Sequence, residues 1–154
     1  MVKKQVKISV ALNRKALYDY EIIETFEAGL CLKGPEVKSL RKGQANLSSS
    51  FARAEEDGIY IYGLQIQPYE FNSVIKIDPL RVRKLLLNKT EIKKISSKSR
   101  EKGFSLIPLE IYFKNGWAKI SLAIAKGKKT FDKKEKIKER DLNRDVRRDI
   151  KNKY

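Results

Sequence analysis

One short turn constrains the fold of this chain more than any other part of the sequence. Asn115-Gly116 separates an apolar run at residues 109–113 from another at residues 117–124. Asn and Gly tolerate the positive φ angles of a type I′ turn, so the two runs are predicted to form a tight hairpin. In the second run, apolar residues alternate with Lys119, Ser121 and Ala123. This period of two predicts a strand that buries one face.

Three further stretches indicate strands. Residues 51–54 and 59–62 flank an Asp57-Gly58 turn, which predicts a second hairpin. Residues 20–32 form another extended stretch, which Gly34-Pro35 brings to an end. The sequence therefore predicts a mainly β protein with antiparallel strands.

Three short helices are predicted between these strands: from Asn13 to residue 19, at residues 36–42, and between Asn88 and Gly103. Asn13 is the predicted N-cap of the first helix, and Gly43 stops the second. Asn88 with Glu91 three residues later is a capping-box pattern, and Gly103 fits the C′ position. Short antiparallel strands and small helices over about 115 residues are typical of a closed or nearly closed barrel of the oligonucleotide-binding type.

Charge divides the chain into two predicted regions, a β-domain at residues 1–125 and a basic tail at residues 126–154. The chain carries a formal net charge of +16, from 35 Lys and Arg against 19 Asp and Glu. The first region has 22 basic and 13 acidic residues, and the second has 13 basic and 6 acidic residues. A surplus of this size repels itself in a compact protein, so it indicates a polyanionic partner.

The tail has a narrow helical periodicity. Apolar residues recur every fourth position at Leu142, Val146, Ile150 and Tyr154, beside a basic stripe of Arg140, Arg144 and Arg148. One apolar residue per turn does not offset an ordering cost of about 1–2 kcal/mol per residue. We expect the tail to be disordered when free and helical when bound. Phe131 among lysines suits stacking on a base, although a charge run can also be a solubilising end.

Several absences argue against catalysis. The chain has no histidine, and Cys31 is its single cysteine, so His-based nucleophilic sites and structural zinc sites are excluded. Glu55-Glu56-Asp57 is the single acidic cluster, and three neighbours in a turn do not converge on a metal as Mg²⁺ requires. We expect no enzyme activity, cofactor or metal. No apolar run reaches the ~20 residues of a spanning helix, and an unpaired cysteine suits a reducing compartment, so a cytoplasmic protein is expected.

Two basic groups in the β-domain are candidate phosphate ligands. Arg81, Arg83 and Lys84 precede an apolar run, and guanidinium groups suit bidentate phosphate contact. The alternative is an exposed basic loop that leads into a buried apolar run. Lys38 and Arg41 share one face of the predicted second helix.

Three stretches resemble the family of small protein B, the SsrA-binding proteins. They are Glu27-Ala28-Gly29 with residues 34–46, residues 78–87, and residues 125–134. The strings Glu-Val-Lys-Ser-Leu-Arg and Arg-x-Arg-Lys-Leu-Leu-Leu in this order are highly specific together. The resemblance extends from about Ile8 to the end of the chain.

The resemblance implies a function without chemistry of its own. A barrel of the oligonucleotide-binding type would grip the tRNA-like domain of transfer-messenger RNA and stand in for its missing anticodon arm. The complex would enter stalled ribosomes for peptide tagging, with the tail in the vacant messenger channel against small-subunit rRNA. Alanyl-tRNA synthetase and elongation factor Tu would act on the same RNA, and the protein would be a monomer. A ribosomal structural or assembly protein that binds rRNA is the alternative.

The resemblance also implies particular residues. It implies that Asn13, Glu27, Leu86, Asn88 and Lys119 bind the tRNA-like domain. The two basic groups described above add Lys38, Arg41, Arg81, Arg83 and Lys84 to the expected ligands. The expected ribosome-binding residues are Lys126, Gly127, Lys128, Lys129, Phe131, Asp132, Lys133, Lys134, Arg140, Arg144 and Arg148. At Lys134 the family usually has arginine, so the planar fork is lost there while the charge stays. Alternatively, Asn13 and Asn88 only cap helices and Leu86 belongs to the core.

Overall fold

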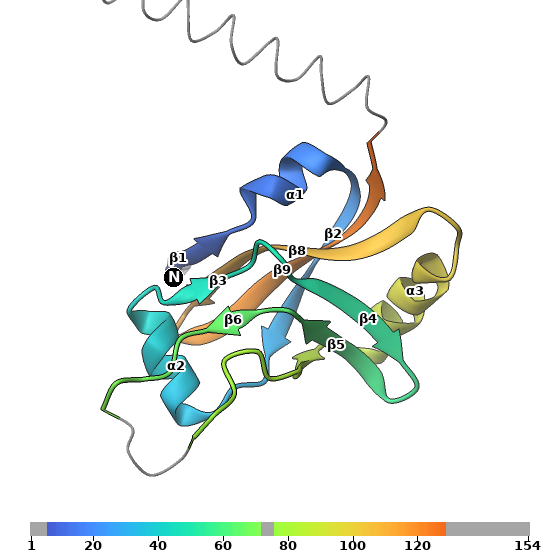
Figure 1. Cartoon of the computed structure of the whole chain (residues 1–154). Coiled ribbons are helices and arrows are strands. Elements are labelled where there is room, and N and C mark those ends of the chain that lie inside the picture. Colours follow the sequence, from blue (N-terminus) through green and yellow to red (C-terminus); the bar gives the residue numbers. More distant parts are fainter. Residues whose placement is uncertain (1–5, 72–75, 129–154) are drawn as a thin grey trace, which may run out of the picture.

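The computed structural model describes residues 6–71 and 76–128. These residues form short strands and three helices (Figure 1). In chain order the elements are β1 (Lys7–Leu12), α1 (Arg14–Asp19), β2 (Tyr20–Leu30), α2 (Gly34–Arg41), β3 (Ala45–Asn46), β4 (Phe51–Glu55), β5 (Gly58–Tyr62), β6 (Gln65–Ile66), β7 (Arg83–Leu86), α3 (Lys89–Ser99), β8 (Phe104–Lys114) and β9 (Trp117–Gly127). The predicted mainly β fold with short helices is confirmed.

The strands close into a ring. The main sheet has the order β1-β8-β4-β5-β7-β2-β9, and β8 pairs in addition with β9. All the pairings are antiparallel. The seam between β4 and β8 has a single residue pair, Ala52 with Leu106. The predicted small antiparallel barrel is therefore present, and its weakest seam lies between these two strands.

Both predicted hairpins are confirmed. Asn115 and Gly116 have φ angles of 51° and 84°, as a turn of the I′ kind requires, and Lys114 pairs with Trp117 across it. Their strands, β8 and β9, are longer than the predicted runs because both continue to the far end of the barrel. The second hairpin joins β4 and β5 and pairs Glu55 with Gly58 at its turn.

The three predicted helices are present, α1 with its predicted ends and α2 and α3 with altered ends. Asn13 caps α1 by accepting a hydrogen bond from the Ala16 N–H. Helix α2 begins two residues earlier than predicted, because Pro35 fits the first turn of a helix. Asn88 caps α3, but the prediction for Gly103 is wrong, since α3 ends at Ser99 and Gly103 (φ 91°) belongs to the turn that leads into β8.

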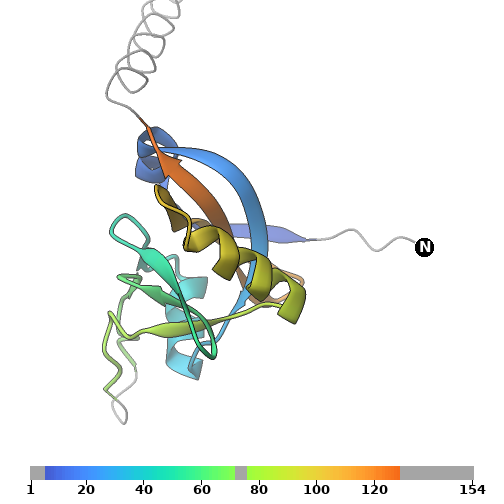
Figure 2. The ribbon, with the colours of Figure 1, turned by 90° about the vertical axis from the view of Figure 1, so that its right-hand side faces the viewer.

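The barrel interior is filled by aliphatic side chains of the strands. Ile59, Leu85 and Ile120 are among those with at most 1% of their surface exposed. Helix α3 adds Ile95 to this core and lies beside the barrel between the β4–β5 hairpin and strands β2 and β9 (Figure 2). Helix α1 instead covers part of the outer face, where Ala16 packs near Ala125. Among the described residues, no helix has the length and apolar character needed to cross a membrane.

Candidate nucleic-acid interface

One row of paired residues crosses five strands on the outside of the barrel. Leu86 of β7 pairs with Gly29 of β2, and Gly29 pairs with Lys119 of β9. Lys119 pairs with Tyr112 of β8, which pairs with Ser9 of β1. Residues directly opposite each other on neighbouring strands present their side chains to the same face. Strand pairing thus brings two predicted ligands, Leu86 and Lys119, onto one continuous surface, which we call the five-strand row.

Glu27 lies two residues before Gly29 on β2, on the same face as the five-strand row and opposite Ser121 of β9. Its Oε2 accepts a hydrogen bond of 2.5 Å from the Tyr112 hydroxyl, and Lys114 Nζ lies 3.3 Å from both carboxylate oxygens. The hydrogen bond from Tyr112, with Lys114 and the charge of Lys119, holds the pKa of Glu27 below its ordinary value. Its side chain is 39% exposed, and within residues 6–71 and 76–128 its Oε1 accepts only the long bond from Lys114. An ionised acceptor thus remains open to an N–H group from outside.

Leu86 is an exposed apolar residue at the edge of the same surface. Its side chain is 56% exposed, which contradicts the alternative that it belongs to the core. A Cβ atom at Gly29 would lie 3.0 Å from the Leu86 Cβ, so glycine there makes room for the leucine. An exposed leucine above a glycine offers a flat apolar contact to an unstacked base.

Asn88 is exposed but occupied by its helix. Its Oδ1 accepts from the Glu91 N–H at 2.9 Å, and its Nδ2 donates to Glu91 Oε1 at 2.6 Å. The capping alternative is thus observed, and a contact to RNA would use the remaining amide proton.

Asn13 lies at the start of α1. Its side chain is buried, donates to the carbonyls of Leu47 and Pro108, and accepts from the Ala16 N–H. Both amide protons and the oxygen are therefore engaged inside the protein. The capping alternative is thus observed, and this buried amide joins α1 to the barrel, while the contact of Asn13 with RNA stays a prediction.

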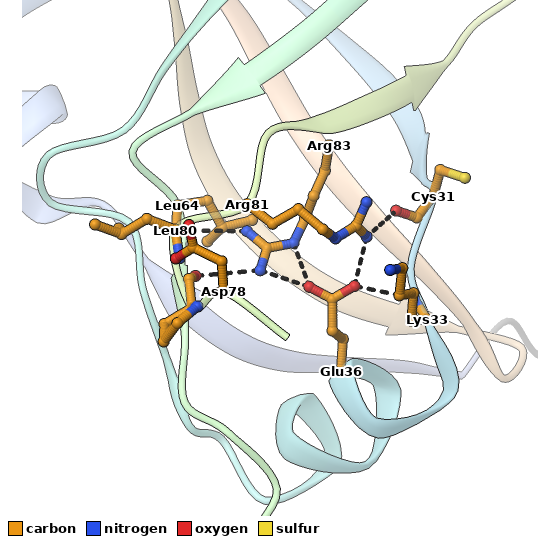
Figure 3. A network of polar contacts seen from close by, with 9 residues as sticks. Cys31, Lys33, Glu36, Leu64, Asp78, Leu80, Arg81 and Arg83 are labelled. Carbon is orange, nitrogen blue, oxygen red and sulfur yellow. Dashed lines mark hydrogen bonds and ion pairs between the residues drawn. The ribbon is translucent and has the colours of Figure 1, made fainter. Parts of the chain in front are cut away.

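Arg81 and Arg83 both direct their guanidinium groups at Glu36 (Figure 3). Arg83 is fully buried, and its Nη2 lies 2.5 Å from Glu36 Oε2, while Nη1 and Nη2 donate to the carbonyls of Leu64 and Pro79. Arg81 is 28% exposed on its side chain and directs Nη2 at Glu36 Oε1 at 2.5 Å. Both arginines are cationic partners of one buried carboxylate. Arg83 is enclosed by the protein, whereas the partly exposed Arg81 stays a predicted phosphate ligand.

Glu36 is the centre of this cluster, and sequence reasoning did not single it out. Its Oε1 also accepts from the Lys33 N–H at 3.0 Å. Burial opposes its ionisation, but the hydrogen bonds from Arg81, the Lys33 N–H and Arg83 outweigh it, so the pKa of Glu36 lies below its ordinary value. We call Glu36, Arg81 and Arg83 the buried triad.

Three further predicted ligands, Lys38, Arg41 and Lys84, are exposed cations. Lys38 and Arg41 lie on the outer side of α2, and the Lys38 ammonium lies 5.3 Å from the centre of the Tyr69 ring. Lys84, between the two triad positions and Leu86, is exposed and lies 6.0 Å from the centre of the Tyr60 ring. These three remain candidate phosphate ligands. Among the described residues, no group of His, Cys, Asp and Glu has an arrangement that could hold a metal ion.

Three predicted ribosome-binding residues can be placed. Lys126 and Gly127 are the last residues of β9, and the Lys128 N–H donates to the Asp19 carbonyl at 3.0 Å. The other predicted tail residues lie outside the described part of the chain: Lys129, Phe131, Asp132, Lys133, Lys134, Arg140, Arg144 and Arg148.

Sequence reasoning also missed Tyr112 and Lys114, which hold Glu27. The signal was available, because the Asn115-Gly116 turn fixes the register of its hairpin and pairs Tyr112 with Lys119. The pairing of β2 with β9 had no comparable local signal.

The chain forms a small closed barrel, and one outer face carries cations, an ionised acceptor and an exposed apolar residue. These features define a nucleic-acid-binding protein of the oligonucleotide-binding type. Comparison with known proteins specifies the family. A family model described as "SmpB protein" matches residues 10–152. The chain belongs to this family.

Relatives are similar over most of their length. The SsrA-binding protein of Elusimicrobium minutum (strain Pei191) is 50% identical over 143 residues, which cover 93% of this chain and 91% of the relative. That of Geobacter metallireducens (strain ATCC 53774 / DSM 7210 / GS-15) is 54% identical over 132 residues, 86% of each chain. A solved structure described as "tmRNA-SmpB: a journey to the center of the bacterial ribosome" is 50% identical, with a TM-score of 0.66 over 78% of this chain and 85% of that chain.

Proposed function

We propose that this protein binds the tRNA-like domain of transfer-messenger RNA and carries it to stalled ribosomes for rescue and peptide tagging. The single observation that carries the proposal is the five-strand row with Glu27 beside it. Membership of a family whose relatives are named for binding SsrA, and likeness to a solved chain described with tmRNA and the ribosome, support it.

The surface divides the work of recognition by residue type. Lys119 supplies a cation for a phosphate, and Lys38, Arg41 and Lys84 extend the positive field around the barrel. Leu86 offers an apolar contact to a base that has left its stack, as single-stranded loops of RNA allow. Glu27 accepts a hydrogen bond from an N–H group on a base edge. A cation at this position would repel that N–H group. Phosphate contacts position the RNA, whereas Glu27 and Leu86 select it.

The rest of the proposal concerns partners and the tail. Residues 126–154, with Phe131 and the arginine stripe, are proposed to bind small-subunit rRNA in the vacant messenger channel. Alanyl-tRNA synthetase and elongation factor Tu would act on the same RNA while the protein, a cytoplasmic monomer, performs no chemistry itself.

Binding to isolated RNA tests the proposal directly. The full chain is titrated with the transcribed tRNA-like domain, with an unmodified tRNA and an rRNA hairpin of equal length as controls. We expect the tRNA-like domain to bind most tightly. A plot of the logarithm of its binding constant against the logarithm of the salt concentration should have a slope of roughly −0.9 per neutralised phosphate, by analogy with duplex DNA. Equal affinity for all three RNAs, or tighter binding of the rRNA hairpin, would favour the ribosomal-protein alternative.

Removing the tail tests the division of labour. The cut should follow Lys128, because β9 continues to Gly127 and Lys126 pairs with Phe104. We expect the shortened chain to keep most of its affinity for the tRNA-like domain and to fail in a peptide-tagging assay on stalled ribosomes. If truncation abolishes binding to the isolated RNA, the body does not hold the RNA by itself.

A further inference from the structure

The tip of the β8–β9 hairpin carries a tryptophan that the proposed function does not use. Trp117 is 73% exposed, the largest exposed fraction among the large hydrophobic side chains of the described residues. It is also the single tryptophan of the chain. Tryptophan is highly buried on average and is enriched at interfaces, so the exposed indole is a candidate contact for a partner.

Strand register places Trp117 on the same face as the five-strand row. It lies two residues before Lys119 on β9, so both side chains point to the outer face. Lys114 is its direct partner across the turn, and Lys7 of β1 is in turn the partner of Lys114. The exposed indole therefore continues the row that carries Lys119.

The hairpin tip is held in place before any partner binds. The Asn115 N–H donates to the Val6 carbonyl at 3.1 Å, and the Val6 N–H donates to Asn115 Oδ1 at 3.3 Å. The turn next to Trp117 is thus tied to the start of β1. A contact surface on a fixed tip loses little conformational freedom on binding, which favours affinity.

The charges around Trp117 indicate the kind of partner. Lys7 lies 2.9 Å from Glu110, and Lys114 lies 3.3 Å from Glu27, whereas Lys119 forms no ion pair within 4.0 Å among the described residues. A flat π face bordered by lysines is the combination that stacks on a nucleobase while cations hold its phosphates. The exposed Ile8 belongs to the opposite face of β1, since it pairs with the core residue Phe113.

We propose that Trp117 stacks on an unpaired base of the bound tRNA-like domain and extends the interface from Lys119 to the hairpin tip. This inference rests on the proposed function, because the base belongs to the RNA that the five-strand row binds. It adds a stacking site to a surface that otherwise relies on Leu86 for apolar contact.

Intrinsic fluorescence reads this contact without a label. The full chain is titrated with the transcribed tRNA-like domain, while the same samples are followed by a gel-shift assay. We expect the Trp117 emission to be quenched in step with binding, and its accessibility to acrylamide to fall. Binding without a change in emission or accessibility would overturn the proposal and leave the proposed function standing. No binding at all would instead contradict the proposed function.

Three variants complete the test. Trp117→Ala should weaken binding by roughly 5- to 150-fold, the range for loss of one base–aromatic stack, and Trp117→Phe should restore most of it. Phe51→Ala, which removes an exposed aromatic residue on β4, is the control and should leave affinity unchanged. Equal affinities of Trp117→Ala and the wild type would refute the stack. Quenching that depends on protein concentration without RNA would point to a second copy of the chain and also refute it.

Discussion

Two glutamates of the barrel stand among cations, and they differ in access to water. Glu36 in the buried triad has 3% of its side chain exposed and meets two arginines at 2.5 Å. Glu27 beside the five-strand row has 39% exposed and meets Lys114 at 3.3 Å and the Tyr112 hydroxyl. The same residue types therefore serve two purposes. The buried triad, the closed cluster of the two, joins α2, β7 and the loop before β7. Glu27 with Tyr112 and Lys114 forms the open cluster, which keeps an acceptor available to a ligand.

The difference has an energetic basis. A buried ion pair gains strong attraction but requires every charge to keep its partner, because an unpaired charge in the interior is costly. An exposed ion pair contributes little to stability, and removing one partner costs little, because water and salt screen the charges. Scaffold and ligand site can thus be separated by experiment, since substitution should affect stability in one cluster and affinity in the other.

The largest expected effect is on the buried triad. Arg83→Met should lower the free energy of unfolding by about 3–5 kcal/mol, because it leaves Glu36 with one cation and removes the hydrogen bond from Arg83 to the Leu64 carbonyl. Lys114→Met is the matched control in the open cluster, with an expected cost of at most about 1 kcal/mol. Urea unfolding of both variants measures the difference. Equal costs would show that burial does not distinguish the clusters.

The second expected effect is on acid stability. The pKa of Glu36 lies below its ordinary value of 4.5 in the folded protein, so its ionised form stabilises the fold at neutral pH. This contribution is fully present above about 4.5, the unfolded value, and is lost as the pH falls through the lower folded value. Unfolding free energies measured from pH 7 downward should therefore decline below that point. Glu36→Gln should be less stable at pH 7 and show a shallower decline, and a parallel decline would exclude Glu36 as the source.

Local patterns account for the parts of the fold that the sequence predicted. The Asn115-Gly116 and Asp57-Gly58 turns and the Asn13 and Asn88 caps each depend on neighbours within a few residues. Strand β1 was missed because its partner, β8, lies about 100 residues further along the chain and no local signal records that pairing.

The buried position of Arg83 was not predicted, and this also has a physical cause. Composition suggests a basic loop before a buried Leu-Leu-Leu run, whereas the backbone is already a strand at Arg83 and alternates buried and exposed side chains through Leu86. A period of two counted from the buried Leu85 places Arg83 inside and Leu86 outside. The alternation was present in the sequence, but the buried arginine is tolerable only because Glu36 lies opposite it, 47 residues away.

The third expected effect concerns Leu86 as part of the open surface. Leu86→Ala should weaken binding to the tRNA-like domain by about 1–2 kcal/mol, roughly 5- to 30-fold, through loss of apolar contact. Leu80→Ala is a matched control, since Leu80 is 55% exposed and Leu86 is 56% exposed. Both variants should unfold with free energies within about 0.5 kcal/mol of the wild type. Equal affinities of the two variants would remove Leu86 from the interface.

The smallest expected effect on stability is at Glu27. Glu27→Gln should change the free energy of unfolding by less than about 1 kcal/mol, because its ion pair with Lys114 is long and exposed. Glu24→Gln is the matched control, since Glu24 lies on the same strand with 38% of its side chain exposed and is paired with Lys94. If Glu27 accepts a base N–H, only Glu27→Gln should lower the preference for the tRNA-like domain over tRNA. A stability loss as large as that of Arg83→Met would instead place Glu27 in the scaffold, and the division between the closed and the open cluster would fail.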